Sequence, residues 1–236
     1  MNTTVRSALP AGDGRRLDSI HDLFTGSMRE RELPKRYDVL RPDDAHQSAY
    51  MLLTGYASRY RLMSDGRRLI TTILVPGDVC DFGFLTNSRV RRPVATLTPC
   101  RIGEISCNPL PDSASWPGLA AALLRRMQRD DVIADERMLT LGRRNAVEAL
   151  AHLFCELRER LSAVKLATAD SFALTIAQDD MGDTLGVTSV HINRSLKVLR
   201  ETGLITLEHG TLTIHDRAAL ERLAHFDPAY LRDEQD

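Results

Sequence analysis

Hydrophobic and polar positions change their period near the middle of the 236-residue chain, from a pattern typical of strands to one typical of helices. Between about Pro34 and Ser106, short β-rich runs alternate with turn signals. The runs occupy residues 50–53, 57–62, 69–75, 94–97 and 101–105. Turn sequences such as Ser64-Asp65-Gly66 and Pro76-Gly77-Asp78 separate them. Many short strands with regularly spaced turns predict an antiparallel roll or barrel.

The helical period starts after Trp116-Pro117 with one long predicted helix that reaches about Gly142. Its apolar stripe consists of Leu119, Ala122, Leu123, Met127, Ile133, Met138 and Leu141. Because this stripe is longer than one small roll could cover, we favour a coiled-coil-like dimer seam over a helix packed along its own domain. Further helices are predicted at about Ala146–Leu161, after Asp216 and over residues 17–24.

The stretch from Gln178 to Ile205 predicts two helices joined by a tight turn. Gly186 lies where the chain reverses, and glycine tolerates the positive φ that such a turn requires. Thr188 or Ser189 is placed to cap the second helix with a side-chain oxygen. This helix, over residues 188–201, directs an apolar stripe inward, formed by Ile192, Leu196 and Leu199.

The opposite side of the second helix carries Ser189, Val190, Asn193, Arg194 and Lys197. Cations, amides and hydroxyls are the groups that reach base edges and phosphates in a DNA major groove. An ordinary amphipathic helix with a solvated face is the alternative. Two β-rich runs follow at residues 204–207 and 211–215, and they predict a hairpin. Helix–turn–helix plus hairpin is the winged arrangement, which favours DNA binding.

Composition and motifs exclude several classes of protein. The net charge of −1 argues against a non-specific nucleic-acid coat. The chain has no apolar run long enough to span a bilayer and no secretory signal, so we expect a cytoplasmic protein without membrane contact. It has no nucleophile elbow, phosphate-binding glycine loop or HExxH motif, and adjacent acidic residues such as Asp179 and Asp180 point about 100° apart. We therefore do not expect an enzyme.

Several strings give the chain a resemblance to the Crp/Fnr superfamily of bacterial transcription regulators. They are TGYASRY, DGRRLITTILVPGDVCDF, LGRRNAVEALAHLFCEL, LGVTSVHINRSLKVLRETGLI and FDPAYL. The resemblance implies an α+β fold with an antiparallel, cyclic-nucleotide-binding-like β-roll at 17–116, a dimerisation helix at 117–144 and a winged helix–turn–helix at 145–236. It also implies a homodimer that reads a palindromic operator in double-stranded DNA, with RNA polymerase as a further partner.

The chain departs from the members of this superfamily that bind cyclic AMP. Those members carry a Gly-Glu pair and an Arg-Ser pair around the cyclic phosphate, whereas this chain has Asp81-Phe82 and Arg92-Pro93 at those places. Pro93 has neither an N–H nor a hydroxyl to offer a phosphate, and Asp81 adds a negative charge. The positions that would meet adenine align with Asp130 and Asp131. We therefore expect no cyclic AMP binding of the usual kind.

Other cofactors of the superfamily are also not expected. Oxygen-sensing members hold an iron–sulfur cluster on an amino-terminal group of cysteines, but the first cysteine here is Cys80. The scattered cysteines are small buried hydrophobes or redox sensors, and we favour the first reading; they are Cys80, Cys100, Cys107 and Cys155. Haem ligation by His21, His46 or His152 is a further alternative that no motif supports.

The resemblance assigns DNA-reading roles residue by residue. Arg194 matches the arginine that contacts a guanine in many members. Val190 stands where many members have a glutamate that accepts a hydrogen bond from cytosine, and valine could instead touch a thymine methyl. Ser189 replaces an arginine, and Asn193 is expected to bond to a base or a phosphate. The expected phosphate contacts are Gln178, His191 and Lys197.

One other function remains open at this point. The chain could be a small-molecule or redox sensor that acts through protein partners and carries a non-functional helix–turn–helix. The dependence of DNA affinity on salt separates the two functions, because a protein that neutralises phosphates loses affinity steeply as salt rises. The effector, the operator sequence and the choice between activation and repression leave no mark on the sequence.

Overall fold

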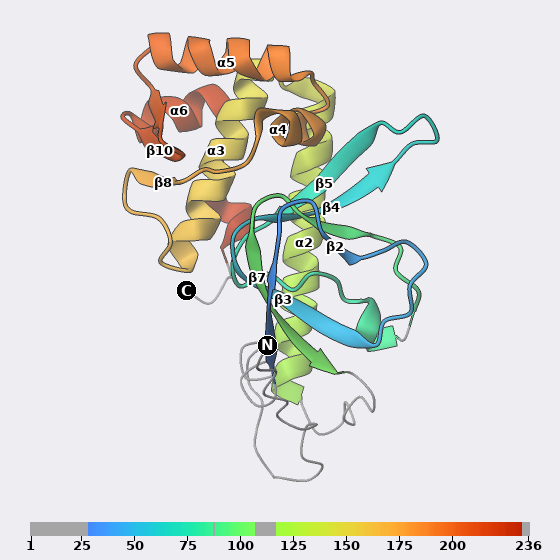
Figure 1. Cartoon of the computed structure of the whole chain (residues 1–236). Coiled ribbons are helices and arrows are strands. Elements are labelled where there is room, and N and C mark those ends of the chain that lie inside the picture. Colours follow the sequence, from blue (N-terminus) through green and yellow to red (C-terminus); the bar gives the residue numbers. More distant parts are fainter. Residues whose placement is uncertain (1–27, 87, 107–116, 233–236) are drawn as a thin grey trace. The chain divides into compact units, whose positions relative to one another are not determined.

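The computed structural model describes residues 28–86, 88–106 and 117–232 (Figure 1). The chain forms two compact units. The first contains the described residues within Met1–Arg59 and Pro76–Asp130, and the second contains Tyr60–Val75 and the described residues within Asp131–Asp236. The helix predicted over residues 17–24 lies outside the described residues.

The amino-terminal half is strand-rich, as predicted. One sheet has the strand order β1-β7-β3, and another has the order β2-β6-β4-β5. The strands are β1 (Arg29–Leu33), β2 (Asp38–Leu40), β3 (Ser48–Thr54), β4 (Ala57–Leu62), β5 (Arg68–Leu74), β6 (Val94–Thr96) and β7 (Cys100–Ser106). A short 3-10 helix, η1, spans Gly83–Thr86. The pairs β1–β7, β3–β7, β2–β6 and β4–β6 are all antiparallel, so the predicted roll is confirmed.

All five predicted strand runs are present, but β1 and β2 were not predicted. The β1 sequence is Arg-Glu-Arg-Glu-Leu, in which only Leu33 is buried. Its backbone pairs with β7 from Arg29 to Leu33, so hydrogen bonds rather than an apolar face hold it. The strand β2 has three residues, too few to display a period of two. Both strands therefore lack the hydrophobic alternation on which the prediction depended.

The core of the first unit lies between the sheet strands, the segment around Val79 and helix α2 (Pro117–Arg143). It contains Ala49, Met51, Val79, Phe82, Phe84, Ile105 and Leu123. Leu123 is the contribution of α2, and it is buried among side chains of this unit. Burying a large apolar side chain contributes about 1.5–3 kcal/mol, so this cluster fixes the segment of residues 79–84 as well as the strands.

The long helix α2 confirms the prediction of a helix to about residue 142, but its apolar residues do not form one seam. Leu123 and Ile133 are buried within the chain. Met127, Met138 and Leu141 are exposed, and so is Leu124, which the predicted stripe omitted. At about 100° per residue, the middle of the buried pair lies roughly 90° from the middle of these four exposed residues, and the exposed Val132 and Leu139 lie still farther from the buried pair. The interpretation of a single continuous stripe was therefore wrong for Leu123 and Ile133.

A capping box at Asn145, just after α2, marks the start of helix α3 (Ala146–Ala163). The Asn145 side chain accepts hydrogen bonds from the backbone N–H groups of Val147 and Glu148, at 3.0 and 3.1 Å. In return the Glu148 carboxylate accepts the Asn145 N–H at 2.9 Å. This reciprocal pair satisfies helix donors that would otherwise lack partners. The Asn-Ala-Val-Glu sequence thus fixes the boundary between the two helices.

The carboxyl-terminal half contains the predicted helix–turn–helix and hairpin. Its elements are β8 (Ser171–Ala173), α4 (Gln178–Leu185), α5 (Ser189–Glu201), β9 (Ile205–Glu208), β10 (Thr211–Ile214), α6 (Arg217–Ala224) and the 3-10 helix η3 (Pro228–Leu231). The strand order is β8-β10-β9. The strand β8 was not predicted; Ser171 begins it and pairs with Thr213 of β10. As with β2, a three-residue strand shows no period.

Helix α3 is the centre of the second unit and packs against α5 and α6 (Figure 1). Its side chains Leu150, Leu153, Phe154 and Leu157 are fully buried. Asp216 caps α6 by accepting the Ala219 N–H, and the helix follows Asp216 as predicted. The segment after α6 also packs onto α3, because the Phe226 ring meets the His152 ring edge-on and the Tyr230 ring stacks on it. Burial lowers the pKa of His152 to about 4, so this histidine is neutral at pH 7.

Candidate nucleic-acid interface

The turn between α4 and α5 depends on two glycines. Gly186 ends α4 with a φ of 66°, the left-handed conformation that the sequence predicted. Gly182, one turn earlier in α4, has a different role. A Cβ added to it would lie 2.6 Å from the Val187 carbonyl oxygen, which belongs to the backbone of the turn. The two helices can approach as they do only with glycine at this place.

Thr188, and not Ser189, caps the second helix. Its Oγ1 accepts the backbone N–H of His191 and also forms a hydrogen bond of 2.8 Å with His191 Nδ1. One hydroxyl therefore starts the helix and orients a side chain that the sequence assigned to a phosphate. After the helix, Gly203 adopts a φ of 70° and turns the chain toward β9.

Helix α5 presents the predicted residues on an exposed face. Ile192, Leu196 and Leu199 are fully buried and fix the rotation of the helix about its axis. On the other side Val190 is 57% exposed. His191, Asn193, Arg194 and Lys197 are also exposed, and Ser189 is partly buried. Gln178 is the first residue of α4 and is partly buried. The structure thus gathers six of the seven predicted DNA contacts on α5 itself.

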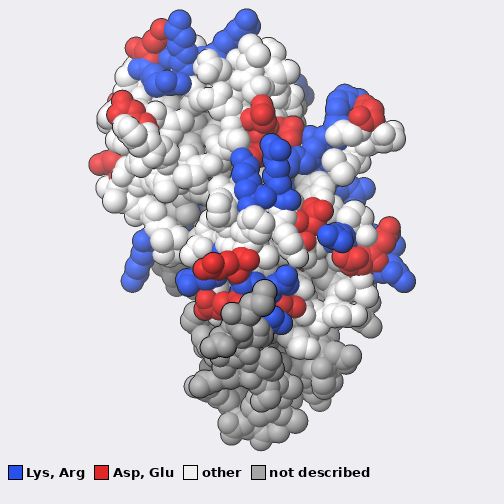
Figure 2. All heavy atoms as spheres, viewed as in Figure 1, with Lys and Arg blue, Asp and Glu red and all other residues white. Residues whose placement is uncertain are grey.

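The cations of α5 are Arg194, Lys197 and Arg200, in its middle and last turns, with Glu201 at its end. Figure 2 shows Lys and Arg side chains gathered over α5, at the upper edge of the view. Lys197 lies 3.6 Å from Glu201, and Arg200 donates to the Leu196 carbonyl. Within the described part of the chain, Arg194 has no hydrogen-bond or ion-pair partner. An exposed guanidinium without a partner is available for a bidentate contact with guanine.

The wing lies directly after α5, as predicted. In it, β9 and β10 pair antiparallel from Ile205–Ile214 to Glu208–Thr211. The connecting turn has positive φ at His209 and Gly210. His209 is exposed at this tip and was absent from the predicted contacts. Its position in the turn between the two β-rich runs was the signal that could have identified it.

A hairpin made by the end of β4 and by β5 is held against the helix–turn–helix within the second unit. Arg68 of β5 donates to Asp180 and Asp183 of α4, at 2.5 and 2.7 Å. Arg160 of α3 donates to the Ile73 carbonyl at 2.9 Å. No role was predicted for Arg68, because its partners in α4 lie more than a hundred residues away in the chain.

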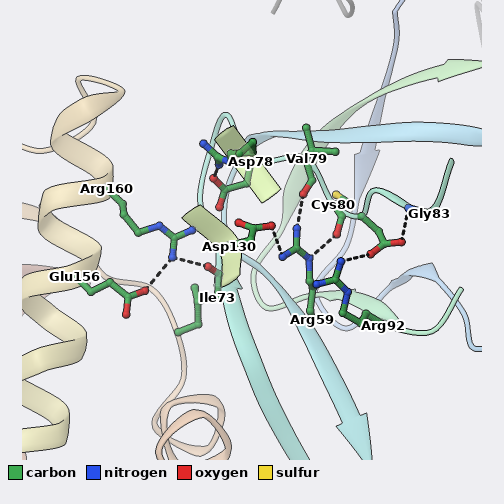
Figure 3. Close-up of polar contacts among 12 residues, drawn as sticks. Arg59, Ile73, Asp78, Val79, Cys80, Gly83, Arg92, Asp130, Glu156 and Arg160 are labelled. Carbon is green, nitrogen blue, oxygen red and sulfur yellow. Dashed lines mark hydrogen bonds and ion pairs between the residues drawn. The ribbon is translucent and has the colours of Figure 1, made fainter. Parts of the chain in front are cut away.

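The roll has a filled interior at the place where the sequence departs from cyclic-AMP-binding proteins. Arg59 of β4 is 1% exposed and lies beside α2 and the segment after the Pro-Gly-Asp turn (Figure 3). It donates to Asp130 at 2.6 Å, to the Cys80 carbonyl at 2.8 Å and to the Val79 carbonyl at 2.9 Å. Asp130 thus serves as an internal counter-ion, whereas its neighbour Asp131 is exposed.

Three features of the described residues concern metal clusters, membrane-spanning helices and exposed cysteines. Among them, no group of three or more His, Cys, Asp or Glu side chains could hold a metal ion, and no helix is long and apolar enough to cross a membrane. Cys80, Cys100 and Cys155 are buried, and Cys107 lies outside the described residues. Burial raises the pKa of Cys80 and Cys155 to about 12 and also raises that of Cys100. A thiol with so high a pKa is a poor redox sensor.

Comparison with known proteins decides the family. Residues 30–110 match the cyclic nucleotide-binding domain, and residues 148–223 match the Crp-like helix-turn-helix domain. The nitrogen fixation regulation protein FixK of Azorhizobium caulinodans is 30% identical over 188 residues, which cover 79% of this chain and 75% of that protein. The chain belongs to the Crp/Fnr family. This confirms both the predicted resemblance and the predicted α+β fold.

Other members of the Crp/Fnr family agree. The anaerobic regulatory protein of Pasteurella multocida is 29% identical over 197 residues, covering 83% of this chain and 72% of that protein. The solved structure of FixK2 from Bradyrhizobium japonicum has a TM-score of 0.72 and 27% identity, and covers 83% of this chain and 96% of that chain. This Crp/Fnr protein is therefore a DNA-binding transcription regulator, and the family members it resembles are regulators, not enzymes.

Proposed function

We propose that this regulator is a homodimer that reads a two-fold symmetric operator, with α5 of each protomer in the major groove. The observation that carries the proposal is the exposed face of α5. There, Arg194 without an internal partner stands one residue from Asn193 and four from Val190, above a fully buried apolar stripe. A rigid helix with such a face matches the geometry of helix–turn–helix readers.

The side chains of α5 suggest separate roles in this complex. Arg194 would donate two hydrogen bonds to a guanine, and Val190 would touch a thymine methyl group. Ser189 and Asn193 lie beside them and would bond to bases or phosphates. His191, oriented by Thr188, would contact the backbone together with Lys197 and Gln178. His209 at the wing tip would lie near the same backbone.

Helix α2 would supply the dimer seam. Its exposed apolar residues are Leu124, Met127, Val132, Met138, Leu139 and Leu141. Large apolar side chains exposed along one helix are typical of a surface that a partner covers. A seam along α2 would give the protein the two-fold symmetry of a palindrome, with half-sites about one helical turn apart. RNA polymerase would be the further partner, and the protein would act by binding alone, without catalysis.

We also propose that the roll works without cyclic AMP or an iron–sulfur cluster. Arg59 and Asp130 neutralise each other inside the roll, and Pro93 has no donor for a phosphate. A ligand that entered the interior of the roll beside Asp130 would have to break the buried ion pair between Arg59 and Asp130. Calorimetric titration with cyclic AMP is therefore expected to show no binding at micromolar concentrations, and a micromolar dissociation constant would contradict this part of the proposal.

Replacement of Arg194 by alanine tests the reading role directly. Because it removes a bidentate contact to one base, we expect the affinity for the cognate site to fall by about 1–3 kcal/mol, or roughly 5- to 150-fold. Fluorescence anisotropy at fixed salt measures the change. Arg222→Ala, on exposed α6, is the matched control and is expected to change affinity far less. Equal affinities of wild type and Arg194→Ala would contradict the assignment.

A further inference from the structure

Asp81 is a buried carboxylate held on both oxygens. Its side chain is 6% exposed. Oδ1 lies 3.2 Å from Arg92 Nη2, and Oδ2 lies 3.2 Å from His46 Nε2. Oδ2 also accepts the Gly83 backbone N–H at 3.0 Å. A carboxylate removed from water is stable only when such groups replace its hydration.

The groups around Asp81 are His46, Arg92 and the Gly83 backbone N–H, and the last of these lies two residues along the chain from Asp81 itself. His46 follows β2 and its side chain is 1% exposed. Arg92 precedes β6, and Gly83 begins η1. A Cβ added to Gly83 would lie 2.2 Å from His46 Nε2 and 2.9 Å from Asp81 Oδ2, so only glycine allows this approach. The Arg92 guanidinium, the Gly83 N–H and the His46 imidazole, whose Nε2 is buried and has no hydrogen bond, therefore converge on one position of the size of a carboxylate.

We propose that His46, Arg92 and the Gly83 N–H form a binding site for a small carboxylate, and that Asp81 occupies it as a tethered internal ligand. Cation, imidazole and backbone N–H arranged around one anion are the elements of an anion receptor. Here the anion belongs to the chain itself. Arg92 is 48% exposed, so one side of the site reaches the surface and a small solute could enter once the tethered carboxylate is gone.

The internal ligand has a structural consequence for the roll. Asp81 lies between Val79 and Phe82, which both belong to the core cluster. Arg59 holds the carbonyls of Val79 and Cys80 in the same segment (Figure 3). By filling the site, Asp81 keeps this segment in place with no solute required. The site is thus closed from within in the wild-type protein and open to formate only in a variant.

Chemical rescue tests this proposal. Asp81→Ala removes the carboxylate and leaves space for formate, and Asp81→Gly leaves space for acetate. We expect Asp81→Ala to lower the Tm by about 5–10 °C. Sodium formate at millimolar concentrations, compared with sodium chloride at equal ionic strength, is expected to restore at least half of the loss with a saturable dependence. Acetate is expected to act better on Asp81→Gly than on Asp81→Ala.

Three controls show whether the rescue comes from this site. Asp81→Asn fills the site with a neutral amide, so formate should have no saturable effect. The double variant Asp81→Ala/Arg92→Ala lacks the guanidinium of the proposed site and should lose the stabilisation by formate. Glu30→Ala breaks an exposed pair with Arg101 in the same unit and should show no response to formate.

The outcomes decide the proposal in either direction. If Asp81→Ala does not fold without formate, its refolding yield replaces the Tm as the readout, and a higher yield in formate supports the site. A variant that is insoluble under both conditions, an unchanged Tm, or a response to formate equal to that of Asp81→Asn would overturn the proposal.

Discussion

Replacing Arg59 with alanine is expected to lower the free energy of unfolding of the first unit by about 3–5 kcal/mol. The guanidinium is buried and donates hydrogen bonds to the Asp130 carboxylate and to the Val79 and Cys80 carbonyls. Its removal leaves the Asp130 carboxylate, which is 9% exposed, without its ion-pair partner. An uncompensated buried charge is among the most costly defects that a single substitution can introduce.

Denaturant unfolding measures this loss, and hydrogen exchange at the amides of β3 and β7, which lie in the first unit, assigns it to that unit. The matched control is Arg101→Ala, which breaks the exposed pair with Glu30 and should cost about 0–1 kcal/mol. A double variant, Arg59→Leu/Asp130→Leu, should recover most of the stability, because no charge is then left buried. A loss below about 1 kcal/mol for Arg59→Ala would contradict the role given to this arginine.

Glu156→Ala is the second substitution with a large expected effect, and it acts on the second unit. The Glu156 carboxylate is 1% exposed and lies 3.2 Å from Arg137 of α2 and 3.0 Å from Arg160 of the same helix, α3. Arg160 also holds the Ile73 carbonyl of the hairpin (Figure 3). Without the carboxylate, two buried guanidinium groups lose their shared counter-ion, and we expect a loss of about 3–5 kcal/mol.

The pH dependence of stability tests whether the Glu156 carboxylate is ionised in the folded protein. Burial raises the pKa of Glu156, but Arg137 and Arg160 outweigh it, so the pKa lies below the ordinary value of 4.5. The ion pairs therefore stabilise the fold fully at neutral pH, and their contribution is lost as the pH falls below about 4.5. Wild type should lose more stability than Glu156→Gln over this range. Parallel pH profiles of the two proteins would show that the carboxylate is not ionised in the fold.

The sequence predicted the helix–turn–helix because its signals are local. Gly186, Thr188 and the stripe of Ile192, Leu196 and Leu199 act within about fifteen residues of one another, and each has the predicted role. The strands of the roll with alternating apolar residues were predicted for the same reason. By contrast, β1, β2 and β8 are held by backbone pairing with distant strands, which a short sequence window does not contain.

The charged interior could not be predicted, because its partners are far apart in the chain. Asp130 was interpreted from its alignment with an adenine contact, while its true partner, Arg59, lies 71 residues earlier. Arg92 and Asp81 were considered as parts of a failed phosphate site, but nothing local indicated that they pair with each other. The apolar stripe predicted on α2 contains the exposed Met127, Met138 and Leu141 but also the buried Leu123 and Ile133. The burial of these two residues depends on tertiary packing, which the period of one helix does not reveal.

The most direct test of the central claim is selection of binding sites from a pool of random duplex DNA. Wild type, Arg194→Ala and the control Arg222→Ala should be taken through the same rounds. We predict that wild type and Arg222→Ala enrich one palindrome with half-sites about 10 base pairs apart, and that Arg194→Ala loses discrimination at one position in each half-site. Enrichment of no symmetric site by the wild type, or of an identical site by Arg194→Ala, would contradict the account.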